Sequence, residues 1–424
     1  MKVSLSNISA TSIKIKPEQL FMLSVLLVNG GNYIYNLLLG RILGPAEFSD
    51  AAILITLLLV LSFVGMTFQI VTAKYAVLFE NTKLNSFLNF ASKYAVTIGI
   101  ILSVLIIVFH KDLQTIFHTQ TSSMFWIFAI GLPIYFLMSV NRGLFQGKDV
   151  LNKLSVTYQF EMLSRLLVTL GIIYLLPFVP TSVAIAIGIV VSFVFGLFPF
   201  QKKIVKAISL VPEQFTEKKG ITLFFMLTAF YELTQILINN SDIILVKHYF
   251  DNEQAGLYAS LALIGRVVYF VAWMFVMLLL PKVIQLKKEG KNTMPLLLKY
   301  VGYIFVLSSF IVLFTFLFPE FVVRLMFGEQ YISIAPLLWK YALATSIFAI
   351  ANIFAYYFLS IDKYIPVIVS AILGSTQIGL IIAFHNSLHQ VVMMQIIAMV
   401  VLLFFQLIYF FYYHKANQLN LRTN

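Results

Sequence analysis

The feature that most constrains this chain is a succession of long apolar runs separated by short polar gaps. A run of roughly 20 apolar residues spans the hydrocarbon core of a bilayer as a helix. Twelve such runs are present: 20–40, 51–73, 94–109, 122–141, 154–178, 181–200, 221–246, 255–281, 300–318, 333–361, 364–384 and 391–413. A water-soluble protein with 60% hydrophobic residues would expose too much apolar surface. The sequence therefore predicts an all-α integral membrane protein with about 12 transmembrane helices.

The basic residues predict how the chain is oriented in the membrane. If the N-terminus is cytoplasmic, 22 of the 29 Lys and Arg residues lie in the two tails and in the gaps on the cytoplasmic side. The gaps on the outer side hold four, which are Arg41, Lys111, Lys247 and Arg324. Cytoplasmic loops of membrane proteins carry such an excess, so both termini are expected in the cytoplasm. The net charge of +12 is spread over many short loops, which argues against a nucleic-acid partner.

The residues needed for common catalytic and cofactor sites are missing. The chain has no cysteine, which excludes disulfides, thiol chemistry and Cys-based metal sites. No G-x-x-x-x-G-K-[ST] segment is present for nucleotide hydrolysis. His385 and His389 share a helical spacing but lack a third ligand, so we interpret them as interfacial histidines. We expect no metal, no cofactor and no enzymatic activity.

The order of the apolar runs indicates an internal duplication. The basic connection 201–220 leaves six runs on each side, and an even number of crossings gives both halves the same orientation. Asn32 and Ser49 of the first half lie 207 residues before Asn239 and Gly256 of the second. We therefore predict two six-helix lobes related as parallel repeats, 1–210 and 211–424, around a central cavity that opens alternately to each side.

Polar side chains recur at helical spacing in the first run of each half. The stripe in the seventh run consists of Thr228, Glu232, Gln235, Asn239 and Asp242. The stripe in the first run consists of Asn29, Asn32 and Asn36. Such amides either join neighbouring membrane helices or line a cavity, and the sequence leaves both interpretations open. For Glu232 we favour the cavity, because a lone carboxylate near the middle of the membrane joins helices poorly.

Two arginines lie deep in the predicted membrane. Arg165 and Arg266 are each eleven residues into their runs, which is about 16 Å along a helix. Glu161 precedes Arg165 by four residues, so an ion pair within one helix is expected there. Arg266 has no charged neighbour in its own run. It is expected either to pair with Glu232 or Asp242 on the preceding helix or to bind an anion, since guanidinium matches phosphate well.

Three further basic residues lie close to the ends of apolar runs. Arg41 and Arg142 are predicted at membrane boundaries, where they would anchor the interface or line a cavity mouth. Lys340 is seven residues from the outer end of its run, so its side chain is expected to extend outward to water.

Three segments carry a resemblance to a known family. The segment 36–48 (NLLLGRILGPAEF) resembles the opening helix and turn of bacterial polysaccharide flippases of the multidrug/oligosaccharidyl-lipid/polysaccharide superfamily. The segment 141–147 is similar to the end of that family's fourth helix, and 240–242 followed by 255–259 resembles its junction between helices seven and eight. Asp50-Ala51 stands where the family usually has Gly-Tyr, a difference that puts none of the implied chemistry in doubt. Helix number, orientation and size extend the resemblance over the whole chain.

The resemblance implies a V-shaped pair of lobes around a hydrated, often cationic cavity in the bacterial inner membrane. The implied substrate is an oligosaccharide linked to a polyprenyl pyrophosphate of the undecaprenyl type, moved from the inner to the outer leaflet for O-antigen, lipopolysaccharide or other surface polysaccharide synthesis. A polysaccharide polymerase is a candidate partner, beside membrane lipids. A sugar–pyrophosphate head group cannot cross hydrocarbon unaided, which agrees with this role.

This hypothesis gives the deep polar residues distinct roles. Arg266 and Arg165 would bind the pyrophosphate, and the amide stripe that includes Asn32, Asn36, Gln235 and Asn239 would bind sugar hydroxyls. Glu232 or Asp242 would couple transport to H⁺ or Na⁺, because a buried carboxylate can titrate.

Two other functions compete with a flippase. An ion-coupled antiporter of small cationic compounds is expected to have an acid-dominated cavity, whereas the deep arginines here balance the acids. A membrane polymerase would be expected to have a large outer loop and a membrane acyltransferase a deep histidine, and the sequence has neither. The flippase is the interpretation we favour.

Overall fold

All regular structure in the described part of the chain is helical. The computed structural model describes residues 17–200, 218–269, 290–361 and 363–423, and within 270–289 it describes 272, 275, 279, 282, 283, 286, 287 and 289. Within these residues, nine helices are long and apolar enough to cross a membrane. The prediction of an all-helical, multi-pass membrane protein is thereby confirmed.

The first half of the chain forms seven helical elements. They are α1 (Pro17–Leu78), α2 (Asn81–Val108), α3 (His110–Phe117), α4 (Ser123–Ile130), α5 (Leu132–Gly147), α6 (Leu151–Leu175) and α7 (Thr181–Gly196). α1 contains both of the first two predicted runs, and it bends at Gly44, whose φ of 75° suits a residue without a side chain. Pro45 follows the bend. α7 is shorter than the nine spans.

The second half begins with α9, since the predicted linker 201–220 lies mostly outside the described residues. Its elements are α9 (Lys218–Tyr249), α10 (Asn252–Gly265), α12 (Met294–Leu317), α13 (Pro319–Met326), the 3₁₀ helix η1 (Glu329–Ile334), α14 (Ala335–Ser360), α15 (Ile365–Ala383) and α16 (Leu388–Thr423). α10 covers only the start of the predicted run 255–281. Most of the remainder falls outside the described residues. The nine spans cover ten of the twelve predicted runs, because α1 holds two runs, α7 is too short to count and the run 255–281 is described only in part.

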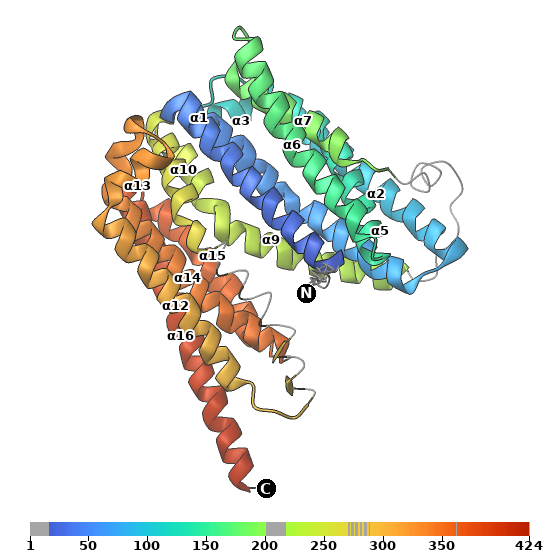
Figure 1. Ribbon diagram of the computed structural model, residues 1–424, viewed down its shortest axis with the longest axis vertical. Coiled ribbons are helices and arrows are strands. Elements are labelled where there is room, and N and C mark those ends of the chain that lie inside the picture. Colours follow the sequence, from blue (N-terminus) through green and yellow to red (C-terminus); the bar gives the residue numbers. More distant parts are fainter. Residues whose placement is uncertain are drawn as a thin grey trace, which may run out of the picture.

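The helices form two groups that meet at α1, α9 and α10 (Figure 1). α1 packs against α5 and α6 of the first half and against α9 and α10 of the second, while α9 also packs against α15. The largest apolar cluster spans both halves and includes Leu39, Phe48, Tyr258, Phe327 and Tyr331. This shared cluster holds the groups together at the end where α1 bends.

Large apolar side chains also cover the outside of both groups. Leu167 on α6, Phe230 on α9 and Phe305 on α12 are each more than half exposed. In water such a surface would drive association, whereas in a bilayer it contacts lipid tails at no such cost.

Candidate functional site

Asp242 and Arg266 form the core of a buried polar cluster in the second half. An Nη atom of Arg266 donates to Oδ1 of Asp242 at 2.7 Å, and the hydroxyls of Tyr341 and Tyr258 donate to Oδ2 at 2.8 and 3.1 Å. Arg266 also donates to the Tyr341 hydroxyl and to Oδ1 of Asn240, at 3.1 and 3.2 Å. The carboxylate therefore accepts three hydrogen bonds, which is the arrangement that a buried charge requires.

The contacts of Arg266 show which of the two acidic residues on the preceding helix it pairs with. Arg266 pairs with Asp242, and among the described residues no ion pair joins it to Glu232. α10 ends at Gly265, so Arg266 stands at the break in the helix. The cavity beside the pair holds about 30 Å³, room for one or two water molecules. A pyrophosphate would need this site to widen.

A second buried cluster joins three helices of the first half. Glu161 on α6 accepts from Arg142 on α5 at 2.7 Å and from Arg165, one turn further along α6. Arg142 also donates to the side chain and the backbone carbonyl of Thr157, both at 3.0 Å. Arg165 donates to Ser192 on α7 at 3.4 Å. With two arginines for one carboxylate, this cluster carries an excess positive charge.

The first-half cluster contains one pair that the sequence predicted and one that it did not. The expected pair between Glu161 and Arg165 is present. Arg142, predicted near a membrane boundary, is buried against its neighbours, and its guanidinium lies 4.1 Å from the centre of the Tyr158 ring. Spacing along one helix revealed the first pair, whereas the second joins residues of two helices.

The amide stripes of α1 and α9 are satisfied mainly within their own helices. Asn36 donates to the carbonyl of Asn32, and Asn239 donates to that of Gln235, both at 2.8 Å. Asn239 lies 3.4 Å from the hydroxyl of Tyr269 as a second acceptor. Within the described part of the chain, Oε1 of Gln235 is buried without a hydrogen-bond partner. The stripes are therefore not the groups that join α1 to α9 in this structure.

The remaining candidates lie at more exposed places. Glu232 on α9 is half-buried and forms no ion pair with any side chain that the structure describes. Arg41 is exposed and donates to the carbonyl of Leu325 at 3.2 Å. The Lys340 ammonium lies 2.7 Å from Nε2 of His389 near the surface, as expected for an interfacial residue.

A third polar cluster, which the sequence did not reveal, joins the two halves. The ammonium of Lys247 on α9 donates to Asp50 and Ser49 on α1 at 2.8 and 2.7 Å, and to Asn252 at 2.6 Å. The backbone N–H of Gln120 donates to the other oxygen of Asp50 at 2.9 Å. The side chains of Lys247 and Asp50 are only 2% and 1% exposed. Lys247, which the sequence placed at the start of an outer gap, is therefore buried in the last turn of α9 and paired with Asp50.

More contacts between the halves lie at the same end. The Tyr331 hydroxyl donates to the carbonyl of Gly40 at 2.6 Å, and the Phe48 and Phe327 rings are 5.7 Å apart. Gly256 packs so closely on the bend of α1 that an added Cβ would lie 1.7 Å from the carbonyl oxygen of Pro45. We call these contacts and the Lys247–Asp50 cluster the seal.

A comparison with protein families identifies the group to which the chain belongs. The model described as "Polysaccharide biosynthesis protein" (Polysacc_synt_3) matches residues 38–336, more than half of the chain. The chain belongs to this polysaccharide biosynthesis protein family. The resemblance seen in the sequence is thereby confirmed. A search of curated proteins finds no match.

Solved structures show that this family member has a transporter fold. An inward-facing multidrug resistance MATE family transporter of the MOP superfamily is similar with a TM-score of 0.69 and 15% identity, over 89% of this chain and 93% of that one. The lipid II flippase MurJ, in an inward closed conformation, is similar with a TM-score of 0.69 and 16% identity, over 92% and 87%. An outward-facing MATE transporter is similar with a TM-score of 0.53 and 13% identity, over 93% and 95%. The fold is thus the one that these MATE and MurJ structures share.

Proposed function

We propose that this protein flips a polyprenyl-pyrophosphate-linked oligosaccharide from the inner to the outer leaflet of the bacterial cell membrane, for synthesis of a cell-surface polysaccharide. The observation that carries the proposal is membership in a polysaccharide biosynthesis family together with a transporter fold. MurJ, a lipid II flippase, shares that fold. The O-antigen and lipopolysaccharide pathways are the context that we favour, and a polysaccharide polymerase would take the product.

In this proposal the chain crosses the membrane twelve times and comprises two six-helix lobes, 1–210 and 211–424, around a central cavity. The bends that connect the first two helices of each lobe support the repeat. Gly44, where α1 bends, lies 207 residues before Asp251, the residue that separates α9 from α10. The same spacing relates Asn32 to Asn239. The two connections contact each other in the seal, as related parts of two lobes would across a central axis.

The arrangement of the seal supports alternating access. Each residue of the seal lies in or beside a connection predicted to face outside: 41–50, 110–121, 247–254 or 319–332. In this proposal the chain is closed on the outer side in this conformation, and a substrate head group would enter from the cytoplasmic side. Transport requires the seal to break and an equivalent closure to form at the other end.

The deep arginines give this pathway an affinity for anions. Arg165 and Arg142 outnumber Glu161, and Arg266 is held in the second half by one carboxylate. We propose that Arg165 and Arg266 exchange partners to hold the pyrophosphate while the cavity is open, with Asn32, Asn36, Gln235 and Asn239 at the sugar. Arg41 and Arg142 remain candidates at the cavity mouth. Glu232 and Asp242 are the groups we assign to H⁺ or Na⁺ coupling.

The second candidate is an ion-coupled antiporter of cationic compounds, favoured by the structural similarity to MATE transporters. A cationic substrate needs a carboxylate that is free to pair with it. Glu161 and Asp242 are both paired with arginine, which leaves Glu232 as the carboxylate that would hold the cation in this alternative.

The leaflet in which the lipid-linked oligosaccharide collects after depletion of the protein tests the proposal. We expect accumulation on the cytoplasmic leaflet, restored by the wild-type chain. Arg266→Ala should fail to restore transport, and the control Arg324→Ala, which alters an exposed arginine, should succeed. Accumulation on the outer leaflet would contradict the proposal.

A double variant separates a role in transport from a role in folding. Arg266→Ala leaves the Asp242 carboxylate buried without its cation, so the protein level should fall. Adding Asp242→Asn removes that charge and should restore the level, while transport stays lost if Arg266 binds the substrate. The variant Asp242→Asn alone measures how much of that loss comes from the coupling role proposed for Asp242. Restored transport in the double variant would assign the arginine a purely structural role.

A further inference from the structure

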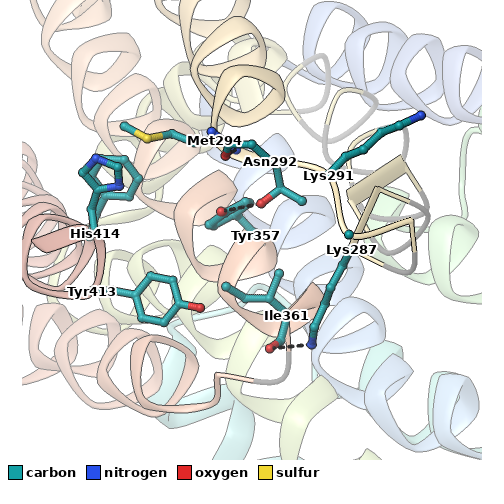
Figure 2. Close-up of a pocket in the computed structure, with 11 residues that line it drawn as sticks. Lys287, Lys291, Asn292, Met294, Tyr357, Ile361, Tyr413 and His414 are labelled. Carbon is teal, nitrogen blue, oxygen red and sulfur yellow. Dashed lines mark hydrogen bonds between the residues drawn. The ribbon is translucent and has the colours of Figure 1, made fainter. Parts of the chain in front are cut away.

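A cavity of about 300 Å³ lies in the second half, at the end of the helices predicted to be cytoplasmic. It shares no residue with the seal or with the two arginine clusters. Figure 2 shows Lys287 and Lys291 on one side, Tyr413 and His414 on the other, and Tyr357 with Met294 between them. The cavity therefore lies among the segment that precedes α12, the end of α14 and the last turns of α16.

One wall of the cavity is basic. The Lys287 ammonium donates to the carbonyl of Ile361 at 3.1 Å, which holds the side chain at the cavity edge. The Lys291 ammonium pairs with Glu289 at 2.7 Å, and these side chains are 67% and 37% exposed. Exposed pairs of this kind contribute little to stability, so Lys291 can exchange Glu289 for another anion. The Lys363 ammonium lies 5.8 Å from the centre of the Tyr413 ring and adds a third positive charge.

The opposite wall is aromatic. The rings of Phe410 and His414 stack at 6.3 Å on α16, and Tyr357 on α14 shares a 2.8 Å hydrogen bond with Thr293. Aromatic side chains with one apolar and one polar end are favoured where a bilayer meets water. A site with ammonium groups on one wall and aromatic rings on the other suits a ligand that carries both a negative charge and an apolar chain.

The segment beside this cavity carries a strong excess of positive charge. Between residues 282 and 299 there are five lysines and a single acid, Glu289. Basic pockets between membrane helices on the cytoplasmic side attract anionic lipid head groups.

We propose that this cavity binds the phosphate group of an anionic phospholipid from the adjacent leaflet. The cavity volume is at the lower end for small-molecule sites, which fits a head group with its acyl chains outside, along the apolar surface of α12 and α16. The site is separate from the pathway for the transported substrate, and it would fix the cytoplasmic end of the second half to the membrane surface.

Native mass spectrometry of the purified full chain in detergent tests this site. Phosphatidylglycerol, zwitterionic phosphatidylethanolamine and inorganic phosphate are each added to the wild type and to Lys287→Gln/Lys291→Gln. Each lysine near an anionic surface strengthens binding of an anionic lipid about fivefold. Loss of two lysines should therefore weaken the binding of phosphatidylglycerol to the double variant about 30-fold. The new amide at position 287 keeps a donor for the carbonyl of Ile361, and both substituted positions are exposed, so the fold should be retained.

The matched control is Lys83→Gln/Lys93→Gln, which removes the same charge from exposed positions at the same end of the first half. The proposal is supported if the control binds phosphatidylglycerol like the wild type and if phosphatidylethanolamine binds weakly to both. It is overturned if the control loses as much affinity as the cavity variant, because net charge would then explain binding. It is also overturned if inorganic phosphate occupies the site and phosphatidylglycerol does not.

Discussion

The buried pair between Lys247 and Asp50 should decide which side of the protein is open. The two charges come from different halves and lie 2.8 Å apart with almost no exposure to solvent. Lys247→Met removes the cation and leaves Asp50 buried. Asp50→Asn with Lys247→Met removes both charges, while the amide oxygen still accepts from the backbone of Gln120.

The expected magnitude follows from the burial of the pair. Removing one partner of a buried pair costs about 3–5 kcal/mol, whereas replacing both partners is often close to neutral. The cost applies only to the conformation in which the seal is formed. At 1.4 kcal/mol for each factor of ten, Lys247→Met should shift the balance away from that conformation by about 100- to 4,000-fold. In the double variant the balance between the two conformations should return most of the way to that of the wild type.

Spin labels at the outer end give the readout. The chain has no cysteine, so Lys111→Cys and Arg324→Cys place one label on each half without background. Both positions are exposed. Double electron–electron resonance in nanodiscs should show a longer distance between the labels in Lys247→Met. In the double variant the distance should match that of the labelled protein with Lys247 and Asp50 intact.

Two results would refute this reasoning about the seal. If Lys247→Met leaves the distance unchanged, the pair does not hold the outer end closed. If the double variant opens as far as the single one, the loss comes from Lys247 itself and not from an unpaired Asp50.

Two further predictions concern the stability of the fold. Arg142→Ala should lower the melting temperature in detergent more than Arg165→Ala, because Arg142 makes three hydrogen bonds and Arg165 makes two. Equal decreases in melting temperature would contradict this difference. Gly256→Ala should destabilise the protein by about 1–3 kcal/mol, because the added methyl group would collide with α1. Gly302→Ala in α12 faces open space and should stabilise the protein by about 0.5–1 kcal/mol. A melting curve in which Gly256→Ala matches the wild type would contradict the close packing at Gly256.

The sequence predicted those features of the fold that depend on local pattern. Apolar run length located the membrane helices, and a four-residue spacing identified the Glu161–Arg165 pair. The bend at Gly44–Pro45 lies where the gap between the first two runs predicted a turn. The depth of Arg266 in its run predicted either a pair with Glu232 or Asp242 on the preceding helix or an anion site, and the structure shows the pair with Asp242.

Pairings between distant segments were harder to predict. Asp50 directly precedes one apolar run and Lys247 directly follows another. In the sequence each is typical of a charge at the end of a membrane helix, and only the packing of the two halves brings them together. Arg142 likewise finds Glu161 only because α5 packs against α6. The signal that was available is the 207-residue spacing, since it relates the two connections, 41–50 and 247–254, that meet in the seal.

Movement of the substrate itself tests the central claim most directly. The purified protein would be reconstituted in liposomes that contain a lipid-linked oligosaccharide, and the sugar exposed on the outer surface would be followed with a glycan-cleaving enzyme that cannot cross the bilayer. We predict that the enzyme reaches nearly all of the sugar in liposomes with the wild-type protein, but only the outer-leaflet fraction in protein-free liposomes and in those with Arg266→Ala/Asp242→Asn. If the wild-type protein leaves the inner-leaflet sugar protected under H⁺ and Na⁺ gradients of either direction, the protein is not a flippase for this class of lipid.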